Sequence, residues 1–90
     1  MIKLHVLKIK RQYFNDILSG QKTFELRKND RDYKVGEYIR FINSNGCAFP
    51  ETNKHLFKII YVLKNVPEYG LSNGYCIFGF RSVSIQNGRD

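Results

Sequence analysis

Five segments of β-type sequence and one short helical pattern fill most of this chain of 90 residues. The five segments are residues 4–9, 22–28, 37–43, 55–64 and 75–80, the last continuing weakly through Val83 and Ile85. They combine alternating polarity with β-branched and aromatic side chains, which favour strands. A short chain with this many strands hides its sheet edges best by curling the sheet on itself. We therefore expect an α+β, mainly β domain: a small pseudo-barrel of about five strands with one short N-terminal helix.

Residues 11–19 predict the helix. Four large side chains recur there at helical spacing, namely Tyr13, Phe14, Ile17 and Leu18. Gly20 follows as a helix terminator, because glycine readily adopts the left-handed conformation. A helix of about two turns depends on packing for its stability. We expect it to plug one end of the sheet, with Tyr13 and Phe14 in the core.

The longest predicted strand, residues 55–64, alternates along its length. A regular strand would place Phe57, Ile59, Tyr61 and Leu63 on one face. The opposite face mixes aliphatic side chains with lysines, so we expect that face to be only partly wet.

A single domain is expected, because ninety residues are too few for two hydrophobic cores. We place the domain at residues 3–85 and expect residues 86–90 to form a flexible tail. The chain contains no run of about 18 apolar residues that could span a membrane. Lysines interrupt the amino end, which therefore does not resemble a signal peptide. These features predict a cytoplasmic protein without membrane contacts.

The chain offers no sequence signature of a metal or cofactor site, and we expect neither. Cys47 and Cys76 form no CxxC pair, and free thiols are the expectation for a chain without a secretion signal. His5 and His55 are isolated, so we expect surface or strand histidines rather than metal ligands.

The charge balance indicates an anionic partner. Lysine and arginine number 15 against 8 acidic residues, which gives a formal net charge of +7 and a pI near 9.6. Such a surface attracts polyanions, and the usual polyanions of a cytoplasm are nucleic acids. We expect RNA or a nucleotide as the partner, with a generic solubility charge as the alternative.

The predicted strand over residues 22–28 contains the charged side chains that most strongly indicate a functional site. Successive side chains point to opposite faces of a strand, so Phe24 and Leu26 share one face. Glu25 and Arg27 share the other face. An acid between basic side chains, followed by a loop rich in Asn and Asp, predicts a polar pocket.

The candidate ligand-binding residues are Lys8, Lys22, Glu25, Arg27, Asn29, Asp30, Arg31 and Tyr75. Arginine offers a planar fork for phosphate or a base edge, and Tyr33 or Tyr75 could stack on a base. A carboxylate repels phosphate, so Glu25 is better suited to a base or a ribose hydroxyl. The phosphates would then lie on outer basic residues such as Lys8, Lys10, Arg11, Lys28, Lys34 and Arg40. The alternative is an internal ion-pair network that only fixes the strand and the loop.

Several stretches together resemble a known superfamily. They are residues 5–9, Tyr13-Phe14, residues 18–33, Val35-Gly36-Glu37 and residues 70–75. Their pattern is similar to the ASCH superfamily of PUA-like domains, and in particular to its short bacterial and phage branch, the domain of unknown function DUF3850. The resemblance implies a β-barrel-like fold with a cleft, and a role in binding RNA or modified nucleosides.

An enzyme branch of that superfamily, the small amidohydrolases that deacetylate acetylcytidine, is similar around the same strand. Lys22 matches its lysine, Glu25 stands where it has a threonine, and Glu68 is the candidate for its distant glutamate. This resemblance implies a second hypothesis, a hydrolase of a modified nucleoside or an RNA phosphodiester with Lys22 and Glu25 as catalytic residues. A binding module remains the first hypothesis, and a protein–protein module the third.

Overall fold

The computed structural model describes residues 2–83, so the predictions for Ile85 and the tail 86–90 lie outside the described residues. The elements in chain order are β1 (Leu4–Lys8), α1 (Arg11–Leu18), β2 (Phe24–Lys28), β3 (Tyr38–Ile42), η1 (Thr52–Lys54), β4 (Leu56–Lys64), η2 (Pro67–Tyr69) and β5 (Tyr75–Val83). All five predicted strands and the predicted helix are present, with boundaries shifted by at most a few residues. The two short 3₁₀ helices, η1 and η2, lie between the predicted strands.

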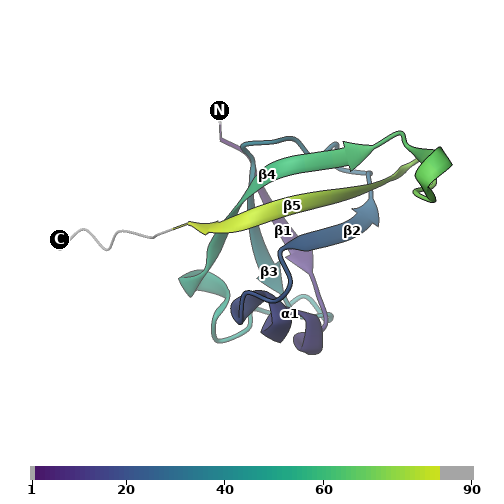
Figure 1. The fold of residues 1–90 in the computed structure, drawn as a ribbon. Coiled ribbons are helices and arrows are strands. Elements are labelled where there is room, and N and C mark those ends of the chain that lie inside the picture. Colours follow the sequence, from purple (N-terminus) through teal and green to yellow (C-terminus); the bar gives the residue numbers. More distant parts are fainter. Residues whose placement is uncertain (1, 84–90) are drawn as a thin grey trace.

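The five strands form one sheet in the order β1-β3-β4-β5-β2. β1 pairs with β3 in parallel, and the other three pairings are antiparallel. The sheet curls into a half-barrel, and α1 lies across one open end of it (Figure 1). This confirms the expected curled, mainly β domain with one early helix. β1 and β2 are the two edges of the sheet, although α1 and β2 follow β1 directly in the chain.

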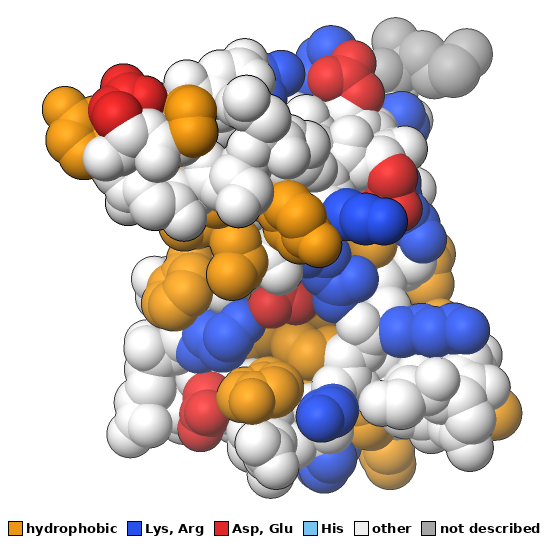
Figure 2. Space-filling model, turned by 90° about the vertical axis from the view of Figure 1, so that its right-hand side faces the viewer, with side chains coloured by type: hydrophobic (Ala, Val, Ile, Leu, Met, Phe, Trp, Pro, Cys, Tyr) orange, Lys and Arg blue, Asp and Glu red, His pale blue; other side chains and the backbone are white. Residues whose placement is uncertain are grey.

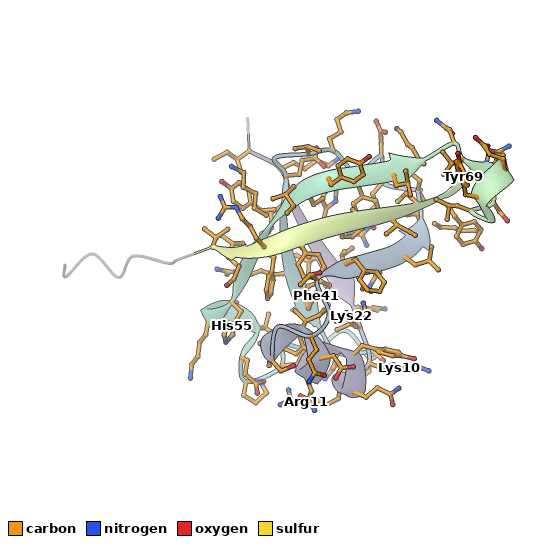
Figure 3. All side chains as sticks on the ribbon, in the orientation of Figure 1. Lys10, Arg11, Lys22, Phe41, His55 and Tyr69 are labelled. Carbon is orange, nitrogen blue, oxygen red and sulfur yellow. The ribbon has the colours of Figure 1, made fainter. Side chains whose placement is uncertain are left out.

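The helix α1 closes the half-barrel through two side chains, Phe14 and Ile17, which are both buried. The ring of Phe14 stacks on Phe49 with centroids 4.6 Å apart and lies 6.0 Å from the ring of Phe41. Figure 3 labels Phe41, which lies between the sheet and α1. Gly20 has a φ of +85° and donates its N–H to the carbonyl oxygen of Ile17, which confirms it as the helix terminator. The predicted packing of the helix against the sheet is therefore confirmed.

Tyr13 is not part of the core, contrary to the expectation, because 42% of its surface is exposed. Neighbouring residues in a helix are turned by about 100° around its axis. In this helix of eight residues, Phe14 and Ile17 occupy the narrow stripe that faces the sheet. Tyr13 consequently lies at the border of that stripe and reaches the surface.

The strand β2 presents its charged face to the inside of the half-barrel. Glu25 is 7% exposed, whereas Phe24 and Leu26 are 48% and 58% exposed. The predicted sharing of faces is confirmed, but the apolar pair is on the outside. An ionised side chain is stable inside only when it is paired, so the neighbours of Glu25 must compensate its charge.

The predicted single alternation of residues 55–64 is wrong. Phe57 and Ile59 are buried, but Tyr61 is 63% exposed. The register between β4 and β5 shifts between Ile59 and Tyr61, where Ile60 forms a bulge. A bulge inserts one extra residue and reverses the parity of the strand beyond it. Tyr61 and Leu63 therefore face outward.

The isolated residues have ordinary structural positions. His5 in β1 is 2% exposed, and its Nε2 lies 2.7 Å from Oε1 of Glu37. Cys47 is an exposed free thiol and Cys76 a buried one. Among residues 2–83 no group of three His, Cys, Asp or Glu side chains could hold a metal ion. No helix in this part of the chain is long and apolar enough to cross a membrane.

Candidate functional site

The two edge strands of the half-barrel, β1 and β2, approach each other along a seam. Arg27 donates from Nη2 to the carbonyl oxygen of Lys8 at 2.5 Å, and Arg31 donates from Nη1 to the carbonyl oxygen of Val6 at 3.2 Å. The carbonyl oxygen of Lys3 and the N–H of Ile9 are hydrogen-bonded to Tyr38 and Ile42 of β3. Carbonyl groups alternate in direction along a strand, so those of Val6 and Lys8 point to the free edge of β1. Two arginine side chains thus donate hydrogen bonds to edge carbonyls that would otherwise be available to pair with a further strand.

An open pocket of about 420 Å³ lies at this seam. Five cationic side chains line it, namely Lys8, Lys10, Arg27, Lys28 and Arg31. The acidic lining residues are two, Glu25 and Asp30. Figure 2 shows this face, where blue side chains lie on both sides of a small red surface in a hollow. The pocket therefore carries an excess of positive charge.

Glu25 lies at the base of the pocket and is held by two cations. Its Oε1 accepts a hydrogen bond from Nζ of Lys22 at 2.5 Å. Its Oε2 accepts from Nη2 and Nε of Arg27 at 3.0 Å and 3.3 Å. These contacts supply the compensation that a nearly buried carboxylate needs. The close contacts explain why the charged face of β2 can point inward.

Lys22 is fixed in place rather than free in solvent. Its ammonium also donates to the carbonyl oxygen of Phe24 at 2.7 Å. The same nitrogen lies 5.2 Å from the centre of the Phe24 ring and 5.9 Å from that of Tyr13. Only 17% of its side chain is exposed. Figure 3 shows Lys22 and Lys10 on the same side of the molecule, close to α1.

The lysines at the rim of the pocket differ from Lys22 and Arg27 at its base, which are paired with Glu25. The side chains of Lys8, Lys10 and Lys28 form no ion pair with any described residue between 2 and 83. A bound anion could therefore be contacted by these three ammonium groups without breaking an existing pair.

Two tyrosines line the pocket in different ways. Tyr33 is 2% exposed and packs between His5 and Phe78, with ring centroids 4.7 Å and 4.6 Å away. Burial raises the pKa of its hydroxyl, although the nearby Arg27 and Arg31 act in the opposite direction. Tyr33 consequently forms part of the floor. Tyr13 is the lining aromatic whose ring remains accessible to a ligand.

One protein-family model matches most of this chain. The model of the family described as "Domain of unknown function (DUF3850)" matches residues 4–80. The chain belongs to the DUF3850 family. A stretch of 39 residues is 43% identical to the "Uncharacterized 12.9 kDa protein in GpA 3'region" of Escherichia phage P2. That stretch covers 43% of this chain and 36% of the phage protein, so the match spans about a third of the length of this curated relative.

In this DUF3850 domain, most of the predicted site residues come together. Those that line the pocket are Lys8, Glu25, Arg27, Asp30 and Arg31, and Lys22 joins them through Glu25. The side chain of Asn29 instead accepts a hydrogen bond from the N–H of Tyr33, which orders the loop after β2. Tyr75 pairs with Lys28 in the sheet and does not line the pocket.

Three lining residues of the DUF3850 pocket had no predicted role in contacting a ligand: Ile9, Tyr13 and Leu26. Tyr13 had been assigned to the core, and its helical spacing contained no signal against that. Lys10 and Lys28 line the pocket, as expected for outer phosphate contacts. The other outer candidates, Arg11, Lys34 and Arg40, do not line the pocket. Arg11 pairs with Glu51, and Lys34 pairs with Asp32.

Proposed function

We propose that this DUF3850 domain is a binding module for RNA or for a nucleotide, which enters the pocket at the seam between β1 and β2. The observation that carries the proposal is the ring of five cations around one neutralised carboxylate in an open pocket. The phosphate of the ligand would contact Lys8, Lys10 and Lys28, which have no ion-pair partner within residues 2–83.

The carboxylate supports a ligand that carries hydrogen-bond donors as well as phosphate. Glu25 receives one donor on Oε1 and two on Oε2 from its neighbours. A carboxylate has about four lone-pair sites, so one acceptor site is left. An exocyclic amine of a base or a ribose 2′-hydroxyl could donate to it. Tyr13, half-exposed at the pocket wall, offers a ring on which the base could stack.

Similarity to the broader ASCH and PUA-like superfamily is consistent with this proposal. The expected β-barrel-like fold with a cleft corresponds to the half-barrel and its seam pocket. The cytoplasmic location expected from the sequence belongs to the same proposal, because RNA and free nucleotides are abundant there.

Hydrolysis of a modified nucleoside or an RNA phosphodiester is the second candidate function. The observation that favours it is the short contact between Lys22 and Glu25, which could pass a proton between these groups. In its present geometry, however, the Lys22 ammonium donates to both Glu25 and the Phe24 carbonyl, and a nitrogen that donates in this way is not a nucleophile. Glu68 lies in η2 and does not line the pocket. Binding is therefore the better-supported function.

Fluorescence anisotropy with short single-stranded and duplex RNA, at two salt concentrations, tests the binding proposal. We expect salt-sensitive binding by the wild type, and weaker binding by Lys8→Ala/Lys10→Ala and by Arg31→Ala. The matched control is Lys54→Ala, which removes an exposed cation of η1 outside the pocket. Equal losses in the control and the pocket variants would overturn the proposed site.

The same preparations can be incubated with acetylcytidine and with RNA and followed by mass spectrometry. A product that forms with the wild type but not with Lys22→Ala or Glu25→Gln would replace the binding module by the hydrolase. Intact substrates together with pocket-dependent binding would support the binding module.

A further inference from the structure

The outer face of β2, β5 and β4 is aromatic and apolar. In the register of the sheet, Gly79 of β5 pairs with Phe24 on one side and with Tyr61 on the other. Phe24 is 48% exposed and Tyr61 63% exposed. In the next outward row, Ile77 pairs with Leu26 and Leu63. These residues form a continuous patch, which we call the outer platform: Phe24, Leu26, Tyr61, Leu63, Ile77 and Gly79.

Gly79 leaves the centre of the outer platform without a side chain. Phe24 and Tyr61 lie on strands two spacings apart, which corresponds to about 9–10 Å between their backbones. The bulge at Ile60 is what turns the Tyr61 ring to this face. A planar ring could therefore rest over Gly79 and stack against one or both of the flanking aromatic rings.

The charges on this face suit an anionic partner. Glu25 is the one acidic residue within the described strands β2, β4 and β5, and it points to the inner face. On the outer face, Lys28 lies beside the platform at one end, and the register pairs Lys58 with Arg81 at the other. An aromatic surface bordered by cations and free of acids is complementary to bases joined by phosphates.

The outer platform is continuous with the pocket. Leu26 belongs to the platform, Lys28 lies next to it, and both also line the pocket. Lys22 connects the two sides, because its ammonium bonds Glu25 at 2.5 Å and lies 5.2 Å from the centre of the Phe24 ring. A chain of nucleotides leaving the pocket over the edge strand β2 would thus meet Phe24 next.

We propose that the outer platform is a second site that stacks the bases of a single-stranded nucleic acid whose phosphate is held in the pocket. This proposal rests on the proposed function of the pocket and extends it across the edge of β2. The two-site arrangement predicts that the contacts made by a ligand depend on its length. A mononucleotide fills the pocket alone, whereas an oligonucleotide also contacts Phe24 and Tyr61.

The test measures the affinity of the full chain for uridine 5′-monophosphate and for single-stranded 12-nucleotide oligouridylate and oligothymidylate. Base–aromatic stacking contributes about 1–3 kcal/mol per base, which corresponds to about 5- to 150-fold in affinity. We expect Phe24→Ala and Tyr61→Ala each to weaken the 12-nucleotide ligands by a factor in that range, and to leave the mononucleotide unchanged. Tyr61→Phe, which keeps the ring, should retain the affinity of the wild type.

The control variant is Tyr69→Ala, because Tyr69 is 83% exposed but lies in η2 at the tip of the β4–β5 hairpin (Figure 3). It should bind all ligands as the wild type does. A second readout is the amide NMR signal of Gly79, which should shift with the 12-nucleotide ligands and not with the mononucleotide.

Two results would overturn the platform, and they are distinguishable. Pocket-dependent binding with unchanged affinity of Phe24→Ala and Tyr61→Ala would reject the platform and leave the pocket function intact. An absence of binding to every nucleotide and oligonucleotide would reject both proposals.

Discussion

Arg27 joins the two edges of the half-barrel, because its Nη2 donates both to the carbonyl oxygen of Lys8 at 2.5 Å and to Oε2 of Glu25 at 3.0 Å. One guanidinium therefore closes the seam and neutralises the carboxylate at the base of the pocket. The strand edge, the buried charge and the pocket are consequently linked through a single side chain.

The first prediction concerns this side chain. We expect Arg27→Ala to destabilise the domain by about 1–3 kcal/mol, because hydrogen bonds to charged groups are lost and Glu25 keeps only Lys22 as a partner. Arg31→Ala removes one longer bond, 3.2 Å, to Val6 and should cost less. Urea unfolding measures both variants. Equal stability of the two variants would contradict the linking role of Arg27.

The second prediction separates the two neighbouring aromatics of α1. Phe14 is fully buried against Phe49, so Phe14→Ala should lower the free energy of unfolding by about 3–5 kcal/mol. Tyr13 is 42% exposed, and Tyr13→Ala should cost far less stability. Its effect should appear in nucleotide affinity, by about 5- to 150-fold if a base stacks on it. Thermal unfolding and anisotropy together check this pair, and a reversed pattern would return Tyr13 to the core.

The third prediction concerns how the stability of the domain changes with pH in acidic solution. Arg11 donates to both carboxylate oxygens of Glu51 at 2.8 Å and 2.7 Å, and this hydrogen bonding lowers the pKa of Glu51 from its ordinary 4.5 to about 2. A depressed pKa in the folded state stabilises the fold above the pKa of the unfolded chain. That contribution is lost as the pH falls from 4.5 to about 2.

Arg11→Ala should therefore reduce the acid sensitivity of unfolding between these pH values and return the Glu51 pKa toward its ordinary value. NMR titration of the Glu51 carboxyl and unfolding at several pH values measure the effect. The pair is exposed, so added salt should weaken it. A Glu51 titration that does not change in Arg11→Ala would disprove the pairing in solution.

The fourth prediction uses the salt dependence of binding. Each phosphate contact on single-stranded nucleic acid contributes about 0.7 to the slope of log affinity against log salt. Removing Lys8, Lys10 or Lys28 should each reduce the slope by roughly that amount for single-stranded RNA. Lys54→Ala is again the control and should leave the slope unchanged. A slope that stays the same in all three pocket variants would show that the phosphates lie elsewhere.

Some features of the site could be predicted because they are local in the sequence. Glu25 and Arg27 alternate within one strand, and Arg31 follows in the next loop, so chain connectivity alone keeps them close. Lys8 and Lys10 reach the pocket only because β1 curls round to face β2. No local sequence pattern could reveal that β1 and β2 lie next to each other in the folded domain.

The sequence by itself determined where the strands and the helix lie, since alternation, helical spacing and a terminating Gly20 act over a few residues. Periodicity also determined which side chains of β2 share a face, but not those of β4, where the bulge interrupts the alternation. It did not determine which face points inward. Glu25 is inside because Lys22 and Arg27 pair with it, and Tyr61 is outside because a bulge reverses β4. Only the tertiary structure decided both, because burial depends on the partners that other elements bring to each face.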